Sequence, residues 1–214
     1  MSKKKSEPTS ARNAKLAEAR KAQQAAERKR TILLVVAAGL VIAFILGAVG
    51  WAVWNERGER KAAGDLSGVQ EYEHEAMEHT QSKVDYSESP PTGGEHNPVW
   101  MNCGVYDEPL PDEHAVHSLE HGAVWITYKP DLEQSEVDEL EKITPDTYAL
   151  LSPYEGDMDS PIVISAWGLQ LGVDSADDPR LKGFIEEYRQ GEQTPEPGAA
   201  CTGGIDSPSQ SQVQ

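Results

Sequence analysis

Only two cysteines occur among the 214 residues of this chain, and several common catalytic motifs are missing. No second cysteine follows Cys103 at the C-x-x-C spacing, which excludes a dithiol redox motif. The chain also lacks a G-x-S-x-G motif, a P-loop, and a G-x-G-x-x-G motif after a predicted strand. The sequence therefore gives no support to dithiol oxidoreductase, serine hydrolase or nucleotide-binding activity.

Charge is distributed very unevenly along the chain. Residues 1–30 contain ten Lys or Arg against three Asp or Glu, whereas residues 55–214 contain nine against thirty-three. Opposite charge in two parts of one chain favours two environments rather than one globule. The acidic part should repel polyanions, so we expect no nucleic-acid partner.

Between these parts, residues 31–54 carry no ionisable side chain and predict one transmembrane helix. An apolar run of about 18 residues or more can cross a bilayer, and Trp51 and Trp54 suit the headgroup region. The basic residues 28–30 predict a cytoplasmic N-terminus, with the C-terminal domain outside the cell membrane. A cleaved signal peptide is the alternative, but the apolar run and the basic leader are both long for one.

This pattern divides the chain into five parts. We expect a basic cytoplasmic tail over residues 1–30, a transmembrane helix over 31–54 and a polar stalk over 55–82. An extracytoplasmic α+β domain should follow over 83–204, and a disordered tail over 205–214. Because a location outside the cell is oxidising, a disulfide between Cys103 and Cys201 is the favoured state of the cysteines. Two free thiols, one of them available to a metal, are the alternative.

Five elements are predicted in the second half of the chain. Strands rich in β-branched and aromatic residues are expected at residues 123–128, 148–153 and 162–167, and helices at 134–143 and 180–189. The order of elements predicts an α+β fold, a small and mainly antiparallel sheet covered by helices.

Histidine clustering is the one chemical signal in the sequence. All six histidines lie within 48 residues, at positions 74, 79, 96, 114, 117 and 121. On a helix, His114, His117 and His121 would share one face, and two histidines four residues apart can chelate one ion. Glu120, or the more distant His79 or His96, could complete the ligand set. Copper and zinc are the candidate metals. The alternative is structural, with imidazoles capping carbonyl groups.

Residues 117–121 also fit the H-x-x-E-H pattern of inverted zinc peptidases. In those enzymes the motif lies inside a long helix of a larger domain, whereas here Gly122 and a predicted strand follow at once. A metal-dependent hydrolase is therefore a remote alternative.

Four separated segments resemble an uncharacterised bacterial family, domain of unknown function 3105. They are residues 84–106, with the run Ser-Pro-Pro-Thr-Gly-Gly-Glu-His, residues 116–128, residues 165–168 and residues 194–201. The resemblance implies an anchored or secreted envelope protein, typically actinobacterial, with no established activity.

The resemblance also places residues at motif positions, namely His79, His96, His117, His121, Cys103 and Cys201. It makes the first four of these residues the better ligand set for a metal. The simplest description is an extracytoplasmic interaction or scaffold domain that binds other envelope proteins. A copper- or zinc-binding protein is the alternative.

Overall fold

The computed structural model describes residues 64–74 and 78–209 of the second half, together with residues 13, 18, 20, 21, 23, 24, 27–30, 33, 39, 40 and 44–51. The chain divides into two compact units, Met1–Arg57 and Gly58–Gln214. The second unit carries the sheet and the histidines.

Six strands and three helices make up the described part of the second unit. In chain order they are β1 (Gln70–Glu71), β2 (Gly104–Val105), α2 (Asp112–Glu120), β3 (Val124–Tyr128), α3 (Gln134–Ile143), β4 (Ala149–Pro153), β5 (Ile162–Ala166), β6 (Leu169–Val173) and α4 (Pro179–Tyr188). The strands form one sheet in the order β1-β6-β5-β3-β4-β2. The predicted α+β class is therefore confirmed, and each of the five predicted elements is present to within a residue at either end.

The sheet is mixed: three of its five strand pairs are antiparallel, as predicted, and the two parallel pairs correct the prediction. Strands β3 and β4 run parallel, with Val124 opposite Ala149, and β2 is parallel to β4 on its other side. The remaining pairs, β3 with β5, β5 with β6 and β6 with β1, are antiparallel. The parallel pair arises because α3 connects β3 to β4, and a helical crossover returns the chain in the same direction.

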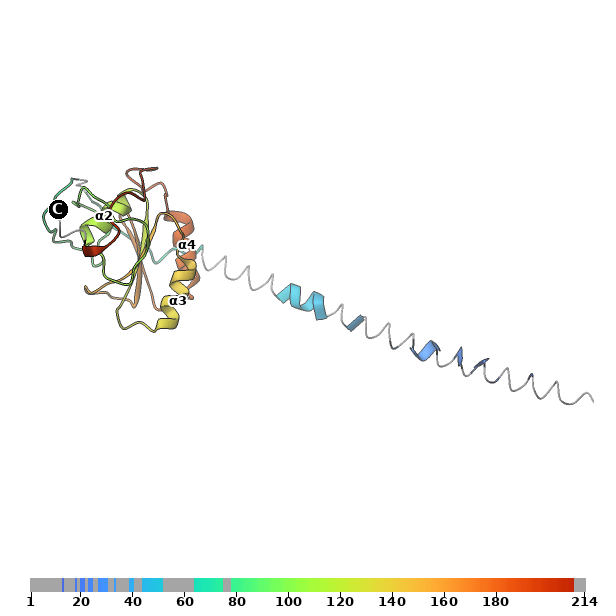
Figure 1. The fold of residues 1–214 in the computed structure, drawn as a ribbon. Helices are drawn as coiled ribbons and strands as arrows, with labels where there is room; N and C mark the ends of the chain where they lie inside the picture. Colours follow the sequence, from blue (N-terminus) through green and yellow to red (C-terminus); the bar gives the residue numbers. More distant parts are fainter. Residues whose placement is uncertain are drawn as a thin grey trace, which may run out of the picture. The chain divides into compact units, whose positions relative to one another are not determined.

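Helices cover both faces of this sheet. Side chains alternate along β3, so Val124 and Ile126 face one core while Trp125 faces the other. The first core includes Leu140 of α3 and Phe184 of α4, and the second is formed with α2 and nearby loops. Figure 1 shows α2 on one side of the sheet and α3 and α4 on the other.

No helix within the described residues is long and apolar enough to cross a membrane. This finding overturns the predicted transmembrane helix and the location in the cell membrane that was based on it. Most of residues 31–54, all of residues 52–63 and residues 210–214 lie outside the described residues.

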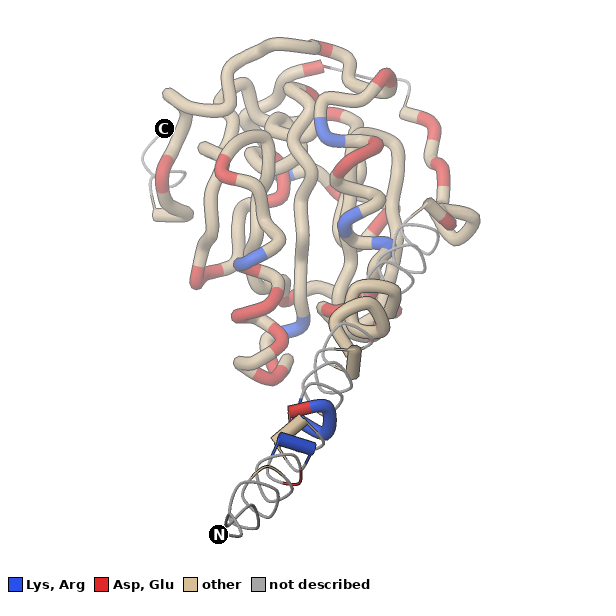
Figure 2. Tube along the Cα trace, turned by 90° about the vertical axis from the view of Figure 1, so that its right-hand side faces the viewer, with Lys and Arg blue, Asp and Glu red and all other residues tan. Residues whose placement is uncertain are grey.

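The predicted disulfide and the acidic excess expected for this part of the chain are both present in the second unit. Cys103 and Cys201 form a disulfide, with Cα atoms 5.5 Å apart, and no described cysteine is free. The bond joins two segments separated by 98 residues and holds the C-terminal segment against the start of β2. Acidic residues lie all along the trace of this unit and outnumber the basic ones (Figure 2).

Candidate metal centre

Helix α2 carries three of the polar groups of the candidate centre. His117 and Glu120 lie one turn apart on its buried side, and His121 is its C-terminal cap. The helix ends here because Gly122 adopts a positive φ of 95°, a conformation that favours glycine. Spacings of three and four residues place all three side chains on neighbouring positions of one face.

Two loop segments bring the other histidines to this face. His79 and His96 are paired by an isolated parallel bridge, in which Thr80 N donates to His96 O at 2.7 Å and His96 N donates to Glu78 O at 3.1 Å. These backbone hydrogen bonds fix two distant stretches of chain side by side. The imidazole rings of His79 and His96 are consequently 4.9 Å apart.

The side-chain ends converge on the carboxylate of Glu120. Its Oε2 lies 3.0 Å from Nε2 of His96, 3.8 Å from Nε2 of His117 and 3.9 Å from Nε2 of His79. One ligand atom from each of these four residues lies within 4.8 Å of all the others. Two atoms bound to one ion at about 2.1 Å can be at most about 4.2 Å apart. The three separations to Glu120 fit within that limit.

The outer nitrogens of the buried rings are anchored to backbone carbonyl groups. His96 Nδ1 lies 2.7 Å from Gly94 O, His117 Nδ1 lies 2.6 Å from Asn97 O, and His121 Nδ1 lies 2.7 Å from Ala200 O. A carbonyl oxygen only accepts hydrogen bonds, so Nδ1 must be the donor in each ring. A neutral ring then presents an unprotonated Nε2 towards the centre, as metal-binding histidines do.

With neutral rings this arrangement points lone pairs at lone pairs, so either a proton or a metal ion must lie between them. Nε2 of His117 lies 3.0 Å from Nε2 of His121, and Nε2 of His96 lies 3.0 Å from the Glu120 carboxylate. Burial, together with the neighbouring rings of His121 and His96, lowers the pKa of His117 to about 4, which disfavours a proton on that ring. Burial alone would raise the pKa of Glu120, but its hydrogen bond to His96 and the adjacent imidazoles lower that pKa below its ordinary value. The cluster therefore favours a positive ion that would bind these lone pairs.

The centre is enclosed on all but one side. The exposed fractions of His96, His117 and Glu120 are 0%, 4% and 3%, whereas the His79 side chain is 46% exposed. His79 therefore marks the side from which solvent reaches the cluster. The three buried groups need partners within the protein or in a bound ion, because unpaired buried polar groups are costly.

A second group of ligand atoms adjoins the first. One ligand atom each of Glu120, His121 and Glu196 lies within 4.8 Å of the other two, and His121 Nε2 is 3.7 Å from Glu196 Oε2. The indole of Trp100 packs beside this region, with ring centres 4.9 Å from His121 and 5.6 Å from His117.

The structure thus brings the four predicted histidines together, and their role as metal ligands stays a prediction. Glu120, which the sequence offered as a residue that could complete the ligand set, lies in the first group, and Glu196 was not predicted. No sequence signal pointed to Glu196, which lies 75 residues beyond His121.

Two histidines lie outside the cluster. His114 directs Nδ1 to Val99 O, so the predicted shared face of three histidines on α2 contributes only His117 and His121. His74 Nε2 pairs with Thr92 Oγ1 at 2.8 Å, and its ring packs edge-on against Trp167. Both have partners that account for their positions.

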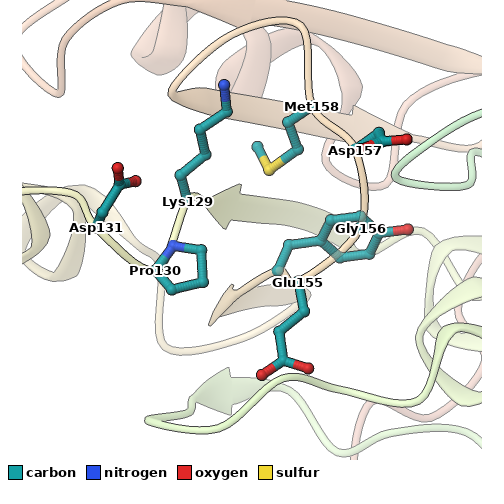
Figure 3. Close-up of a pocket in the computed structure, with 8 residues that line it drawn as sticks. Lys129, Pro130, Asp131, Glu155, Gly156, Asp157 and Met158 are labelled. Carbon is teal, nitrogen blue, oxygen red and sulfur yellow. The ribbon is translucent and has the colours of Figure 1, made fainter.

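A separate surface pocket of about 330 Å³ offers no comparable chemistry. Residues 129–131 and 154–158 line it. In Figure 3 the carboxylates of Asp131, Glu155 and Asp157 point in different directions rather than towards a common point. None of them belongs to a group of potential metal ligands among the described residues.

Comparison with known proteins gives one match. Residues 78–203 match a family described as "Protein of unknown function (DUF3105)". The matched region includes all the residues of both ligand groups. No curated protein and no solved structure matches the chain.

Proposed function

The chain belongs to the DUF3105 family of proteins of unknown function, and we propose that it binds a transition-metal ion through His79, His96, His117 and Glu120. One observation carries the proposal. The buried imidazoles of His96 and His117 turn their Nε2 atoms towards the buried Glu120 carboxylate, because backbone carbonyls hold their Nδ1 atoms as donors. A cation is the partner that satisfies such a group.

The ligand types indicate the class of metal. Three imidazoles and one carboxylate suit Zn²⁺ and Cu²⁺ alike. Among the described residues, Met101 is fully buried in the second core and both cysteines are in the disulfide, so none of these sulfur atoms is a ligand. This set therefore favours a divalent ion over Cu⁺, which prefers thiolate and thioether ligands.

The other two hypotheses gain no observation of this strength. A metal-dependent hydrolase would use Glu120 to activate water, but its carboxylate lies 3.0 Å from His96, in the position of a ligand or hydrogen-bond partner. An interaction or scaffold role with other proteins stays a prediction.

Metal analysis of the full-length chain without a histidine tag tests the proposal. The protein is stripped with a chelator, loaded with Zn²⁺ or Cu²⁺, and freed of unbound ion by gel filtration. At least one equivalent is expected to remain bound. His96→Ala should lower the affinity at least tenfold, since it removes a fully buried ligand.

His114→Ala is the matched control. His114 lies on the same face of α2 as His117, is also buried and also directs Nδ1 to a backbone carbonyl, but it lies outside the cluster. This variant should keep the wild-type affinity. Less than a tenth of an equivalent in the wild-type protein, with both ions, would refute the proposal.

A further inference from the structure

The two ligand groups share one residue, and we infer that the centre holds two ions bridged by the carboxylate of Glu120. The first ion would take His79, His96 and His117, and the second would take His121 and Glu196. This inference rests on the proposed function, because the second ion is described relative to the first.

Geometry separates the two groups while keeping them adjacent. His121 groups with Glu120 and Glu196 rather than with the first four residues. Its Nε2 is nevertheless only 3.0 Å from that of His117, a ligand of the first ion. Two ions that share a bridging carboxylate typically lie about 3.5–4 Å apart, which suits ligand groups in such close contact.

Backbone contacts hold the second group in place. His121 is anchored through Nδ1 to Ala200 O, and Glu196 N donates to the carbonyl of Glu120 at 3.1 Å. The neighbouring Cys201 is fixed by the disulfide to Cys103. The C-terminal segment is therefore tied directly to the end of α2, and Glu196 is kept beside His121.

Burial provides a further argument for a ligand between His117 and His121. Both rings are about 4% exposed and both use Nδ1 on backbone carbonyls, so their Nε2 atoms, 3.0 Å apart, face each other lone pair to lone pair when the rings are neutral. A single ion in the first group leaves the nitrogen of His121 facing a metal-bound ring. A second ion gives that nitrogen its own partner.

The two sites differ in chemical character. The first offers three nitrogens and one oxygen, whereas the second offers one nitrogen and two carboxylates, of which Glu196 is 55% exposed in its side chain. Carboxylate-rich sites accept harder ions such as Mn²⁺ as well as Zn²⁺. We therefore expect the second site to bind more weakly and to exchange its ion more readily.

Counting bound Co²⁺ in the full-length chain tests this inference, because Co²⁺ accepts both nitrogen and oxygen ligands. Metal analysis and visible absorbance should report two equivalents in the wild-type protein, filled in two steps. Glu196→Gln should lower the count to one while leaving the first step unchanged. Glu192→Gln, an exposed acid in the same segment, is the control and should keep two.

Electron paramagnetic resonance gives an independent signal. Two Co²⁺ ions joined by a carboxylate couple magnetically, so the wild-type signal at two equivalents should be weaker than twice that of Glu196→Gln at one. Because Glu196 is on the surface, its replacement should leave the fold intact, which circular dichroism would verify.

The outcomes distinguish the two proposals. One equivalent in the wild-type protein, or two equivalents that persist in Glu196→Gln, would overturn the second site and leave the first standing. No bound Co²⁺, Zn²⁺ or Cu²⁺ would overturn both.

Discussion

Binding of an ion should raise the melting temperature of this protein in a way that depends on His96. The four ligands of the first site come from two loop segments and α2, which the chain brings together only when it folds. The unfolded chain therefore lacks the site, and an ion at about 100 times its dissociation constant should stabilise the fold by about 2.7 kcal/mol. For a unit of this size that corresponds to a shift of about 5–11 °C.

Replacing His96 should remove nearly all of this shift. Loss of the ligand is expected to weaken binding by about 100-fold, so the same ion concentration then equals the dissociation constant and stabilises by only about 0.4 kcal/mol. The expected shift is about 1 °C. Differential scanning fluorimetry of His96→Ala and His114→Ala, with and without Zn²⁺, measures both values.

The comparison uses the ion-induced shift rather than the melting temperature itself, because both variants lose a buried imidazole and should be less stable without ion. His114→Ala should keep the full shift. Equal shifts in the two variants would refute the reasoning, since the stabilisation would then not arise from the cluster.

Three further predictions concern stability. Replacing both Cys103 and Cys201 with serine should lower the free energy of unfolding by up to about 4–5 kcal/mol, because the disulfide closes a loop of 98 residues, and urea titration measures it. Asp112→Asn should raise the free energy of unfolding by about 2 kcal/mol at about pH 8 and hardly change it near pH 3.5. The reason is that burial raises the pKa of Asp112 to about 6, so the folded state resists its ionisation and loses stability as pH rises towards that value. Gly122→Ala should cost about 1–3 kcal/mol, because φ is 95° and the new Cβ would lie 3.0 Å from Thr194, and thermal unfolding measures it.

Each of these predictions has a contradictory result. An unchanged denaturant midpoint in the double serine variant would mean that the disulfide does not restrain the unfolded chain. An Asp112→Asn effect of the same size at both pH values would show that its charge is not the cause. A fully stable Gly122→Ala would show that the turn after α2 accommodates a side chain.

The sequence predicted the elements whose patterns reflect apolar burial. Strand β3 and helix α3 were recognisable because the first is rich in β-branched and aromatic residues and the second repeats Val137, Leu140 and Ile143 at helical spacing. Helix α2 was not assigned as an element, because its buried face carries His117 and Glu120 among its apolar residues. The polar groups that make the candidate site conceal the helical pattern.

Strand β6, the parallel pairing of β3 with β4 and the second ligand group were not predicted from the sequence. Strand β6 was missed because it follows β5 after only two residues, the first of which was assigned to the preceding predicted strand. The parallel pairing of β3 and β4 follows from the α3 connection and could have been inferred from the order of the elements. Glu196 reaches His121 only because the C-terminal segment folds back, which no local pattern encodes.

The partial exposure of His79 has a consequence for the kinetics of metal exchange. Three ligands of the first site are nearly inaccessible, so an incoming or departing ion must pass the one imidazole that solvent reaches. The bridge between His79 and His96 holds that imidazole by two backbone hydrogen bonds, and brief opening of this bridge would set the rate of passage. Different residues would then govern affinity and exchange rate: the enclosed ligands would set the affinity for the ion, and His79 would set how fast the ion enters and leaves.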